Sequence, residues 1–332
     1  MNVGIVGAGA WGTALAVHLA SRAASAPRVT LWARDAAKAR EIDRARENAL
    51  YLPGIALPAA LCVTADLARV AAAELLIVAT PVAALIEATR RLADAGARAC
   101  LVWLSKGFVS DDEGVALAHQ RIAPRWDAPV GVVSGPSFAE EVARGLPTAL
   151  TVAATAPALA AEVAALLRGD TLRAYESDDI AGVETGGAVK NVLAIAAGAS
   201  DALGFGHNAR AALITRGLAE TGRLAAALGG RRETLMGLAG VGDLVLTCTG
   251  DLSRNRRVGL ALAKGKALPW ILADLGHVAE GVGAARAVRR LAAQHAVDMP
   301  ICEAVDRALH EGLPVGEAVA ELLRREPRPE AH

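Results

Sequence analysis

The chain has 332 residues, which is long enough for one large domain or two ordinary domains with sizeable cores. Hydrophobic residues make up 53% of it and charged residues 21%, a globular composition that leans apolar. Basic and acidic residues balance at 35 each, so no net charge favours nucleic acid or an acidic membrane surface as a partner.

The cysteines and the apolar segments indicate the compartment. The four cysteines are far apart and fit no metal or disulfide spacing, so we expect reduced, mostly buried thiols: Cys62, Cys100, Cys248 and Cys302. The start MNVGIVGAGAWG lacks the basic region and cleavage site of a signal peptide. The longest uncharged run, residues 145–161, is short and contains two prolines. These features predict a cytoplasmic protein without an integral membrane segment.

The first half of the chain alternates short apolar segments with helical patterns. This alternation predicts an α/β fold with a Rossmann-type doubly wound parallel sheet. The expected strands cover residues 2–6, 28–32, 75–79, 100–104 and 130–133, and residues 149–153 and 172–175 are two further candidates.

Strand patterns stop near residue 178, and the rest reads as helices separated by glycine and proline. We therefore expect a dinucleotide-binding domain over residues 1–178 and an all-α, substrate-binding domain over residues 179–325. Residues 326–332 are expected to form a disordered tail.

The first expected strand leads into Gly7-Ala8-Gly9-Ala10-Trp11-Gly12 and then into an amphipathic helix. Glycines at this spacing permit a tight turn, close approach of the backbone to a pyrophosphate and close packing of the helix. The free N–H groups of the helix start face the anion. A bare GxGxxG pattern is weak evidence, but its place between a strand and a helix predicts dinucleotide binding.

The end of the second strand bears on which dinucleotide is bound. An acidic residue there would bind the ribose hydroxyls of NAD(H), whereas an arginine can hold the 2′-phosphate of NADP(H). Arg34 occupies this place and favours NADP(H), and Asp35 directly after it leaves NAD(H) as the alternative.

Two motifs follow later strands, where ligands of doubly wound sheets bind. The first, CLVWLSKG, carries Lys106, which could also be an ordinary loop lysine. The second, VVSGPSFAEEV, carries Ser137, which together with Glu140 has the spacing of a capping box. Capping would account for Ser137 without a functional role.

The segment TGGAVKNVLAIAAGAS contains one ionisable residue, Lys190, and no partner for it at helical spacing. Thirty of the 35 basic residues are arginine and only five are lysine. A desolvated lysine can release a proton near neutral pH and an arginine cannot, so Lys190 is a candidate for proton chemistry. The alternative is a lysine whose ammonium reaches solvent from a buried helix.

The helical half contains GLAGVGDLVLTCTGDLSRNRRVG. Asp243 lies in an apolar, glycine-rich stretch, so we expect it to have a cationic partner. The adjacent Ser253, Arg254 and Asn255 offer donors suited to a phosphate monoester, or they form the solvated start of a basic helix. The histidines show no metal-binding pattern, and no metal is expected.

Together these segments resemble the bacterial NAD(P)-dependent glycerol-3-phosphate dehydrogenases. The resemblance extends, in order, from GAGAWGTALA through SKG, SGPSFAEEVARGLPTA, GGAVKNVLAIAAG and NARAALITRGLAE to GLAGVGDLVLTCTGDLSRNRR and HVAEGVGAA. It implies reversible reduction of dihydroxyacetone phosphate to sn-glycerol 3-phosphate, which supplies the backbone of phospholipids. It also implies a Rossmann-type domain followed by a helical substrate domain. We expect a homodimer that forms through the helical domain.

The resemblance implies a role for individual residues. The implied catalytic residues are Lys190, Lys106 and Asp243. Lys190 is the proton donor and acceptor, and Lys106 contacts both cofactor and substrate. The implied substrate-binding residues also include Gly135, Ser137, Asp243, Ser253, Arg254 and Asn255. The implied cofactor-binding residues are Gly7, Gly9, Ala10, Trp11, Gly12, Arg34, Lys106, Ala139, Arg254, Val278 and Glu280. Many relatives carry serine where this chain has Ala10, so a contact from that hydroxyl is lost here.

This resemblance gives Lys190 a chemical task. Hydride transfer to a ketone carbon leaves an alkoxide, which a positioned ammonium can protonate. An apolar helix lowers the pKa of the lysine towards a useful value, and Lys106 acts in the same direction while polarising the carbonyl. The closest alternatives are a ketopantoate reductase or β-hydroxyacid dehydrogenase and a non-catalytic dinucleotide sensor. The SRNRR cluster favours a phosphorylated substrate, and a sensor has no need of the two lysines with Asp243.

Overall fold

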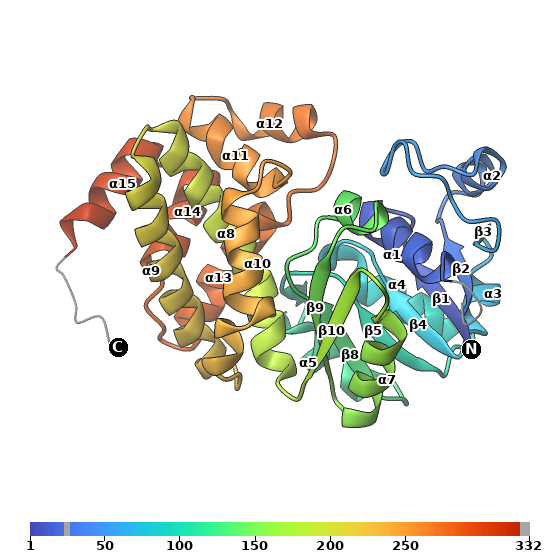
Figure 1. Ribbon diagram of the computed structural model, residues 1–332. Helices are drawn as coiled ribbons and strands as arrows, with labels where there is room; N and C mark the ends of the chain where they lie inside the picture. Colours follow the sequence, from blue (N-terminus) through green and yellow to red (C-terminus); the bar gives the residue numbers. More distant parts are fainter. Residues whose placement is uncertain (23–26, 326–332) are drawn as a thin grey trace. The chain divides into compact units, whose positions relative to one another are not determined.

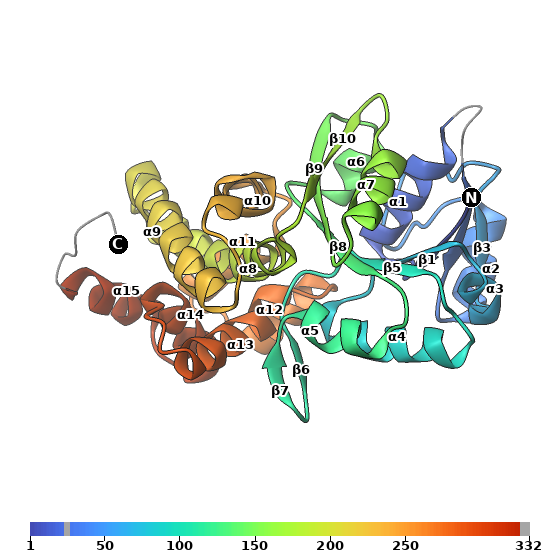
Figure 2. The same cartoon turned by 90° about the horizontal axis from the view of Figure 1, so that it is seen from below.

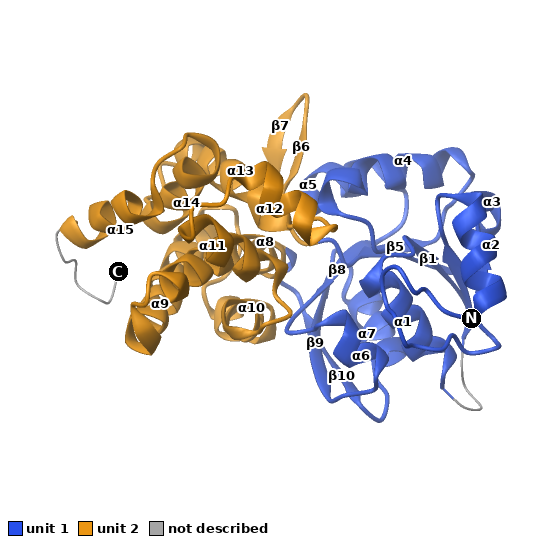
Figure 3. Ribbon diagram, turned by 90° about the horizontal axis from the view of Figure 1, so that it is seen from above, with its two compact units in different colours: residues 1–105, 118–180 blue, residues 106–117, 181–332 orange. Residues whose placement is uncertain are grey.

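The computed structural model describes residues 1–22 and 27–325, whose contacts form two compact units (Figure 3). The first unit comprises residues 1–105 and 118–180, and the second comprises residues 106–117 and the chain from residue 181 onward. The boundary expected near residue 178 is close to this division, but the sequence did not indicate that residues 106–117 belong with the helices. The expected tail, residues 326–332, lies outside the described residues.

The first unit is built on an eight-stranded sheet with the order β10-β9-β8-β5-β4-β1-β2-β3 (Figure 1). The pairs are parallel except for β8 and β9, which run antiparallel and so depart from the expected all-parallel sheet. All seven expected strands are present, and β3 is additional. The strands are β1 (Asn2–Val6), β2 (Arg28–Trp32), β3 (Cys62–Thr64), β4 (Leu75–Val78), β5 (Cys100–Trp103), β8 (Val130–Ser134), β9 (Thr148–Ala154) and β10 (Leu172–Ser177).

Helices cover both faces of this sheet, as the fully buried strand β4 (LLIV) requires. One face carries α1 (Ala10–Ala20), α6 (Ala139–Ala143) and α7 (Pro157–Leu167), and the other carries α4 (Leu85–Asp94) and α5 (Ala118–Ile122) (Figure 3). Beside β2 and β3 lie α2 (Ala36–Ala45) and α3 (Leu67–Ala71). The core includes Ile5, Leu15, Leu31 and Val163, each at most 1% exposed. This arrangement confirms the predicted Rossmann-type unit.

The second unit is helical, as predicted, apart from one hairpin. Its helices are α8 (Ile180–Ala202), α9 (Gly206–Ala227), α10 (Asp243–Thr249), α11 (Arg254–Ala263), α12 (Leu268–Leu275), α13 (Glu280–Gln294), α14 (Pro300–His310) and α15 (Val315–Arg324). The hairpin of β6 (Val109–Asp111) and β7 (Gly114–Ala116) contacts α13 through β7 (Figure 2). It was not expected, because three-residue strands carry no clear periodicity.

Helix α8 is the central helix of this unit. It is long and apolar enough to cross a membrane, but 89% of its most apolar stretch is buried inside the protein. Burial on all sides explains why its sequence has no polar face. Such a helix positions its few polar side chains within a protein core.

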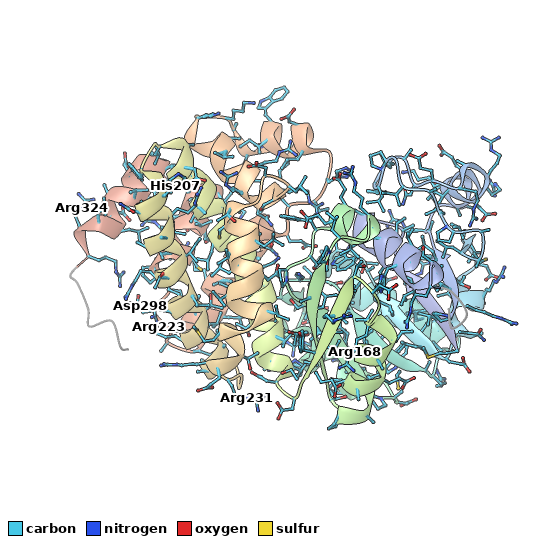
Figure 4. The ribbon with its side chains drawn as sticks, viewed as in Figure 1. Arg168, His207, Arg223, Arg231, Asp298 and Arg324 are labelled. Carbon is cyan, nitrogen blue, oxygen red and sulfur yellow. The ribbon has the colours of Figure 1, made fainter. Side chains whose placement is uncertain are left out.

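Contacts of α9 hold the start of α14. The Glu220 carboxylate accepts hydrogen bonds from the backbone N–H groups of Ile301 and Cys302 at the first turn of α14. One turn along α9, the Arg223 guanidinium donates to the backbone oxygen of Asp298 (Figure 4). The two bonds to Glu220 satisfy N–H donors that the helix start leaves free, and the Arg223 bonds hold the backbone just before it.

The four cysteines are not paired with one another in the structure. Cys248 and Cys302 are buried, whereas Cys62 and Cys100 are half-buried. Burial raises the pKa of Cys248 to about 12, so this thiol stays protonated and unreactive at neutral pH.

Candidate active site and cofactor loop

Two lysines share one buried carboxylate in the helical unit. The Asp243 side chain, at the start of α10, is only 1% exposed. Its Oδ2 accepts a hydrogen bond of 2.6 Å from Lys106 Nζ, and its Oδ1 accepts one from Lys190 Nζ. Lys190 also donates to Thr247 Oγ1 at 2.9 Å. The expected cationic partner of Asp243 is therefore present, and there are two.

The backbone near Asp243 allows this close approach. The segment η4 (Leu238–Gly242), directly before α10, is a π-helical turn, a feature that often marks functional sites. A Cβ atom at Gly186 would lie 2.5 Å from the backbone oxygen of Ala239, so only glycine permits this contact. Gly186 lies one helical turn before Lys190 on the same face of α8. The missing side chain thus lets α10 bring its carboxylate to the lysine.

The environment of Lys190 sets its protonation. Burial is the largest influence on the pKa of Lys190, and together with the nearby charge of Lys106 it outweighs the opposing effect of Asp243, so that the pKa is lowered to about 8. A pKa of about 8 leaves the group mostly protonated at neutral pH but able to release its proton. The ammonium does not reach solvent, since Lys190 is only 7% exposed. The alternative of a solvent-reaching lysine is therefore wrong.

A second polar cluster begins at the next residue of α8. Asn255 Nδ2 donates to Asn191 Oδ1, and Asn255 Oδ1 accepts from the backbone N–H of Gly281, both at 2.9 Å. Asn191 and Asn255 are both less than 9% exposed. Asn255 is thus held by α8 on one side and by the start of α13 on the other.

The two residues before Asn255 differ in their surroundings. Ser253 is the buried N-cap of α11, and its Oγ accepts from the backbone N–H of Arg256. Arg254 is exposed and lies within the electrostatic influence of Glu280. Val278, two residues before Glu280, is 52% exposed. The SRN motif is therefore more than a solvated helix start, because two of its three residues are buried.

The glycine-rich loop of the first unit has the geometry of a dinucleotide site. Gly7 has a φ of +118°, which side chains rarely adopt, and a Cβ atom at Gly12 would lie 2.0 Å from the Gly7 oxygen. Gly9, the N-cap of α1, has nothing within 4 Å of the place where a Cβ would stand. Ala10 and Trp11 form the first turn of α1. The space at Gly9 beside the free N–H groups fits a pyrophosphate.

A residue from a distant loop holds this turn in place. Asn48 is 2% exposed, and its Nδ2 donates to the backbone oxygen of Ala8 at 2.9 Å and to Thr13 Oγ1 at 2.8 Å. Both acceptors belong to the glycine-rich loop or the first turn of α1. Asn48 thereby fixes the loop from the side of the core.

Arg34 and Asp35, the two residues that bear on cofactor choice, follow shortly after β2 and have different surroundings. Asp35 is the N-cap of α2, and its Oδ1 accepts hydrogen bonds from the backbone N–H groups of Ala37 and Lys38. Arg34, one residue earlier, is exposed. The Asp35 carboxylate is thus engaged with the backbone of α2, whereas the Arg34 side chain faces solvent.

The loop after β8 corrects one expectation. Ser137 and Glu140 do not form a capping box, because α6 begins after Phe138 without a side-chain cap. Ser137 Oγ instead donates back to the backbone oxygen of Gly135 at 2.9 Å, where Gly135 has a φ of +133°. Ala139 is the first residue of α6. The Ser137 hydroxyl still has its acceptor capacity available for a ligand.

Sequence reasoning missed three residues that the structure brings into these sites: Asn48, Asn191 and Thr247. Each is a neutral polar residue buried in the core, at most 5% exposed. Asn191 and Thr247 are adjacent to or one turn from an expected site residue, so their helical spacing was the available signal. Asn48 gave no comparable signal, because its partners are about 35–40 residues away in the chain.

A Rossmann-type unit with this loop, together with a helical unit in which two lysines share one buried carboxylate, defines a dinucleotide-dependent oxidoreductase. Residues 2–160 match the family described as NAD-dependent glycerol-3-phosphate dehydrogenase N-terminus, and residues 179–320 match the corresponding C-terminus. The chain therefore belongs to the NAD(P)-dependent glycerol-3-phosphate dehydrogenase family, as its motifs implied. Both NAD(H) and NADP(H) fit an enzyme of this family.

Whole-length relatives agree with this assignment. Glycerol-3-phosphate dehydrogenase (NAD(P)+) of Cupriavidus taiwanensis is 56% identical over 99% of this chain and all of that protein. The crystal structure of glycerol-3-phosphate dehydrogenase from Coxiella burnetii has a TM-score of 0.92 and 42% identity, covering 98% of this chain and 99% of that one. A ketopantoate reductase from Ralstonia eutropha has a TM-score of only 0.58 and 17% identity, covering 96% of this chain and 100% of that one. At this identity the likeness concerns the fold alone.

Proposed function

We propose that this enzyme catalyses the reversible reduction of dihydroxyacetone phosphate to sn-glycerol 3-phosphate, with Lys190 as the proton donor. The observation that carries this proposal is that the buried Asp243 carboxylate binds both the buried Lys190 and the half-buried Lys106. The bound NAD(P)H would supply a hydride to the ketone carbon, and the ketone oxygen would then carry the negative charge of an alkoxide. The Lys190 ammonium gives that oxygen a proton and becomes a neutral amine.

Asp243 and Lys106 have supporting roles in this proposal. The Asp243 carboxylate fixes the direction of the Lys190 ammonium and opposes the lowering of its pKa by burial. Lys106 supplies a positive charge that stabilises negative charge on the ketone oxygen as it develops. Thr247 Oγ1 accepts a hydrogen bond from the Lys190 ammonium and so restricts its orientation.

Binding of the substrate phosphate is assigned to the second cluster. Ser253, Arg254 and Asn255 offer a hydroxyl, a guanidinium and an amide, and Asn191 holds Asn255 in a fixed orientation. We assign Gly135 and Ser137 to the substrate as well, and Ala139, Val278 and Glu280 to the cofactor, because these positions match the family motifs. Binding energy from the phosphate can orient the reacting ketone.

We infer a preference for NADP(H) over NAD(H), because Arg34 is exposed while Asp35 is used as a helix cap. The metabolic role that fits the reaction is the supply of glycerol phosphate for phospholipids in the cytoplasm. The cytoplasmic location and a homodimer through the helical unit stay predictions.

The proposed activity is tested by following the absorbance of the nicotinamide band with three substrates. Consumption of NADPH should be rapid with dihydroxyacetone phosphate and very slow with dihydroxyacetone or a 2-keto acid. A preference for the 2-keto acid would show that the substrate assignment is wrong, and equal rates with and without the phosphate would exclude the phosphate-binding role.

A further inference from the structure

Helices α8 and α11 cross in direct backbone contact. A Cβ atom at Gly198 would lie 2.0 Å from the backbone oxygen of Arg256, and one at Gly259 would lie 1.9 Å from that of Ile195. No side chain can occupy either place, so glycine is required on both sides of the crossing. Such a contact sets the distance between the helices but leaves α11 without side-chain interlocking at that point.

Polar contacts hold the crossing at two separate places. On the side of Lys190, Asn255 of α11 donates to Asn191 of α8. On the other side, the Asp201 carboxylate near the end of α8 accepts two hydrogen bonds from Arg256 of α11, from Nε at 3.0 Å and Nη2 at 2.7 Å. These two contacts fix the rotation and the register of α11 on α8.

Asp201 also binds a third helix. Arg210 Nη1, in the first turns of α9, donates to both carboxylate oxygens of Asp201 at 3.0 and 3.1 Å. The same guanidinium contacts the ring of His207, which lies at the start of α9 (Figure 4). The Asp201, Arg210 and Arg256 side chains are 13%, 20% and 13% exposed, so this junction is largely shielded from water.

We propose that Asp201 is a positioning residue for the substrate phosphate. It contacts neither Lys190 nor Asn255, but through Arg256 it holds the first turn of α11, which carries Arg254 and Asn255. This inference rests on the proposed function, in which those two residues bind the phosphate. It assigns the far end of α8 a role in the same site as Lys190, eleven positions earlier on that helix.

The charges explain why Asp201 is not interchangeable with a neutral residue. Its single carboxylate lies between two guanidinium groups that repel each other. Replacement by an amide removes the charge that holds them together and leaves a shielded cation pair. We expect Arg256 to turn towards its exposed partner Asp251 and to take the first turn of α11 with it.

The experiment compares Asp201→Asn with Asp251→Asn in the full-length enzyme. Both changes remove a carboxylate that binds Arg256, but Asp251 is 97% exposed. Inorganic phosphate serves as the probe, through its inhibition constant against dihydroxyacetone phosphate, because it reports the phosphate site without the reacting atoms. Asp201→Asn should raise this constant and the KM about 10- to 100-fold, since a displacement near 1 Å has effects of this size. Asp251→Asn should stay within about twofold.

Two further readouts separate positioning from general loss of structure. In Asp201→Asn, kcat/KM with dihydroxyacetone should fall much less than with the phosphorylated substrate. Arg256→Lys keeps the charge but not the two-nitrogen contact, so it should reproduce the weaker phosphate binding if Asp201→Asn does not fold. Wild-type phosphate inhibition in either folded variant would overturn the proposal, as would equal losses on the two substrates.

Asn255→Ala distinguishes a wrong role for Asp201 from a wrong assignment of the phosphate site. Unchanged phosphate inhibition in Asn255→Ala would contradict the phosphate-binding role itself. If Asn255→Ala weakens phosphate inhibition while Asp201→Asn and Arg256→Lys do not, the site assignment stands and the positioning role of Asp201 is wrong.

Discussion

Lys190 Nζ is hydrogen-bonded to Asp243 Oδ1, although 53 residues separate them and neither is solvent-exposed. The same carboxylate holds Lys106, so two ammonium groups and one carboxylate leave a net positive charge in the core. A surplus positive charge in a protein interior is energetically unfavourable when nothing compensates it. Beside a developing alkoxide the same charge is stabilising. This pairing is the basis of the proposed role of Lys190 in the reaction.

Replacement of Lys190 by arginine should remove most turnover. Arginine keeps the positive charge but cannot release a proton, so kcat should fall by about 10²- to 10⁴-fold. Lys264→Arg makes the same change at an exposed position and serves as the control. Steady-state rates with circular dichroism as the folding check provide the measurement, and near-normal turnover in folded Lys190→Arg would contradict proton transfer by Lys190.

Asp243→Asn should lower the pKa of Lys190 further. Asp243 raises this pKa, while burial and Lys106 lower it, so the last two effects would act unopposed. The pH above which ketone reduction declines should therefore move to a lower value. It is measured from the pH profile of kcat/KM. Asp306→Asn, which changes a similarly buried aspartate paired with Arg289, should leave the profile unchanged. An unchanged profile in Asp243→Asn would rule out this electrostatic role.

Arg34→Ala should weaken the binding of NADPH far more than that of NADH. A charge-assisted contact to a phosphate contributes about 1.5–3 kcal/mol, which corresponds to roughly 10- to 100-fold in Kd. Titration of both cofactors, with the exposed Arg40→Ala as control, measures the difference. Equal weakening of the two would mean that Arg34 does not bind the 2′-phosphate.

Asn48→Ala should weaken both cofactors equally. It removes the two hydrogen bonds that hold Ala8 and Thr13 at the glycine-rich loop, a feature common to both dinucleotides. Two lost hydrogen bonds should also lower the free energy of unfolding by about 1–3 kcal/mol. The same titrations and a denaturant unfolding curve test this, with the exposed Asn208→Ala as reference. Wild-type affinity for both cofactors would show that the loop keeps its shape without Asn48.

The sequence was most informative where local pattern decides the structure. The glycine spacing at Gly7 to Gly12 predicted a loop whose three glycines each have a distinct steric environment. The apolar runs predicted seven strands, because strands buried on both faces are almost entirely hydrophobic. The three-residue strands β3, β6 and β7 were missed, since segments that short show no period.

The expected capping box at Ser137 was wrong for a local reason. Its hydroxyl bonds back to Gly135, and α6 begins one residue later than the pattern requires. The sequence indicated that Asp243 needs a cationic partner, but it did not indicate which one. The pairing of Asp243 with Lys190 spans 53 residues and therefore depends on the fold. The buried asparagines and the Asp201 junction depend on the fold in the same way.

The most direct test of Lys190 as the proton donor is the pH dependence of kcat/KM for reduction of dihydroxyacetone phosphate by the wild-type enzyme. With Lys190 as the proton donor, reduction would require its ammonium form, and the pKa of this group is about 8, lowered mainly by burial. The rate should therefore be constant below this pH and fall about tenfold per pH unit well above it, while glycerol 3-phosphate oxidation rises with pH over the same interval. Reduction that stays constant far above pH 8 would contradict the account.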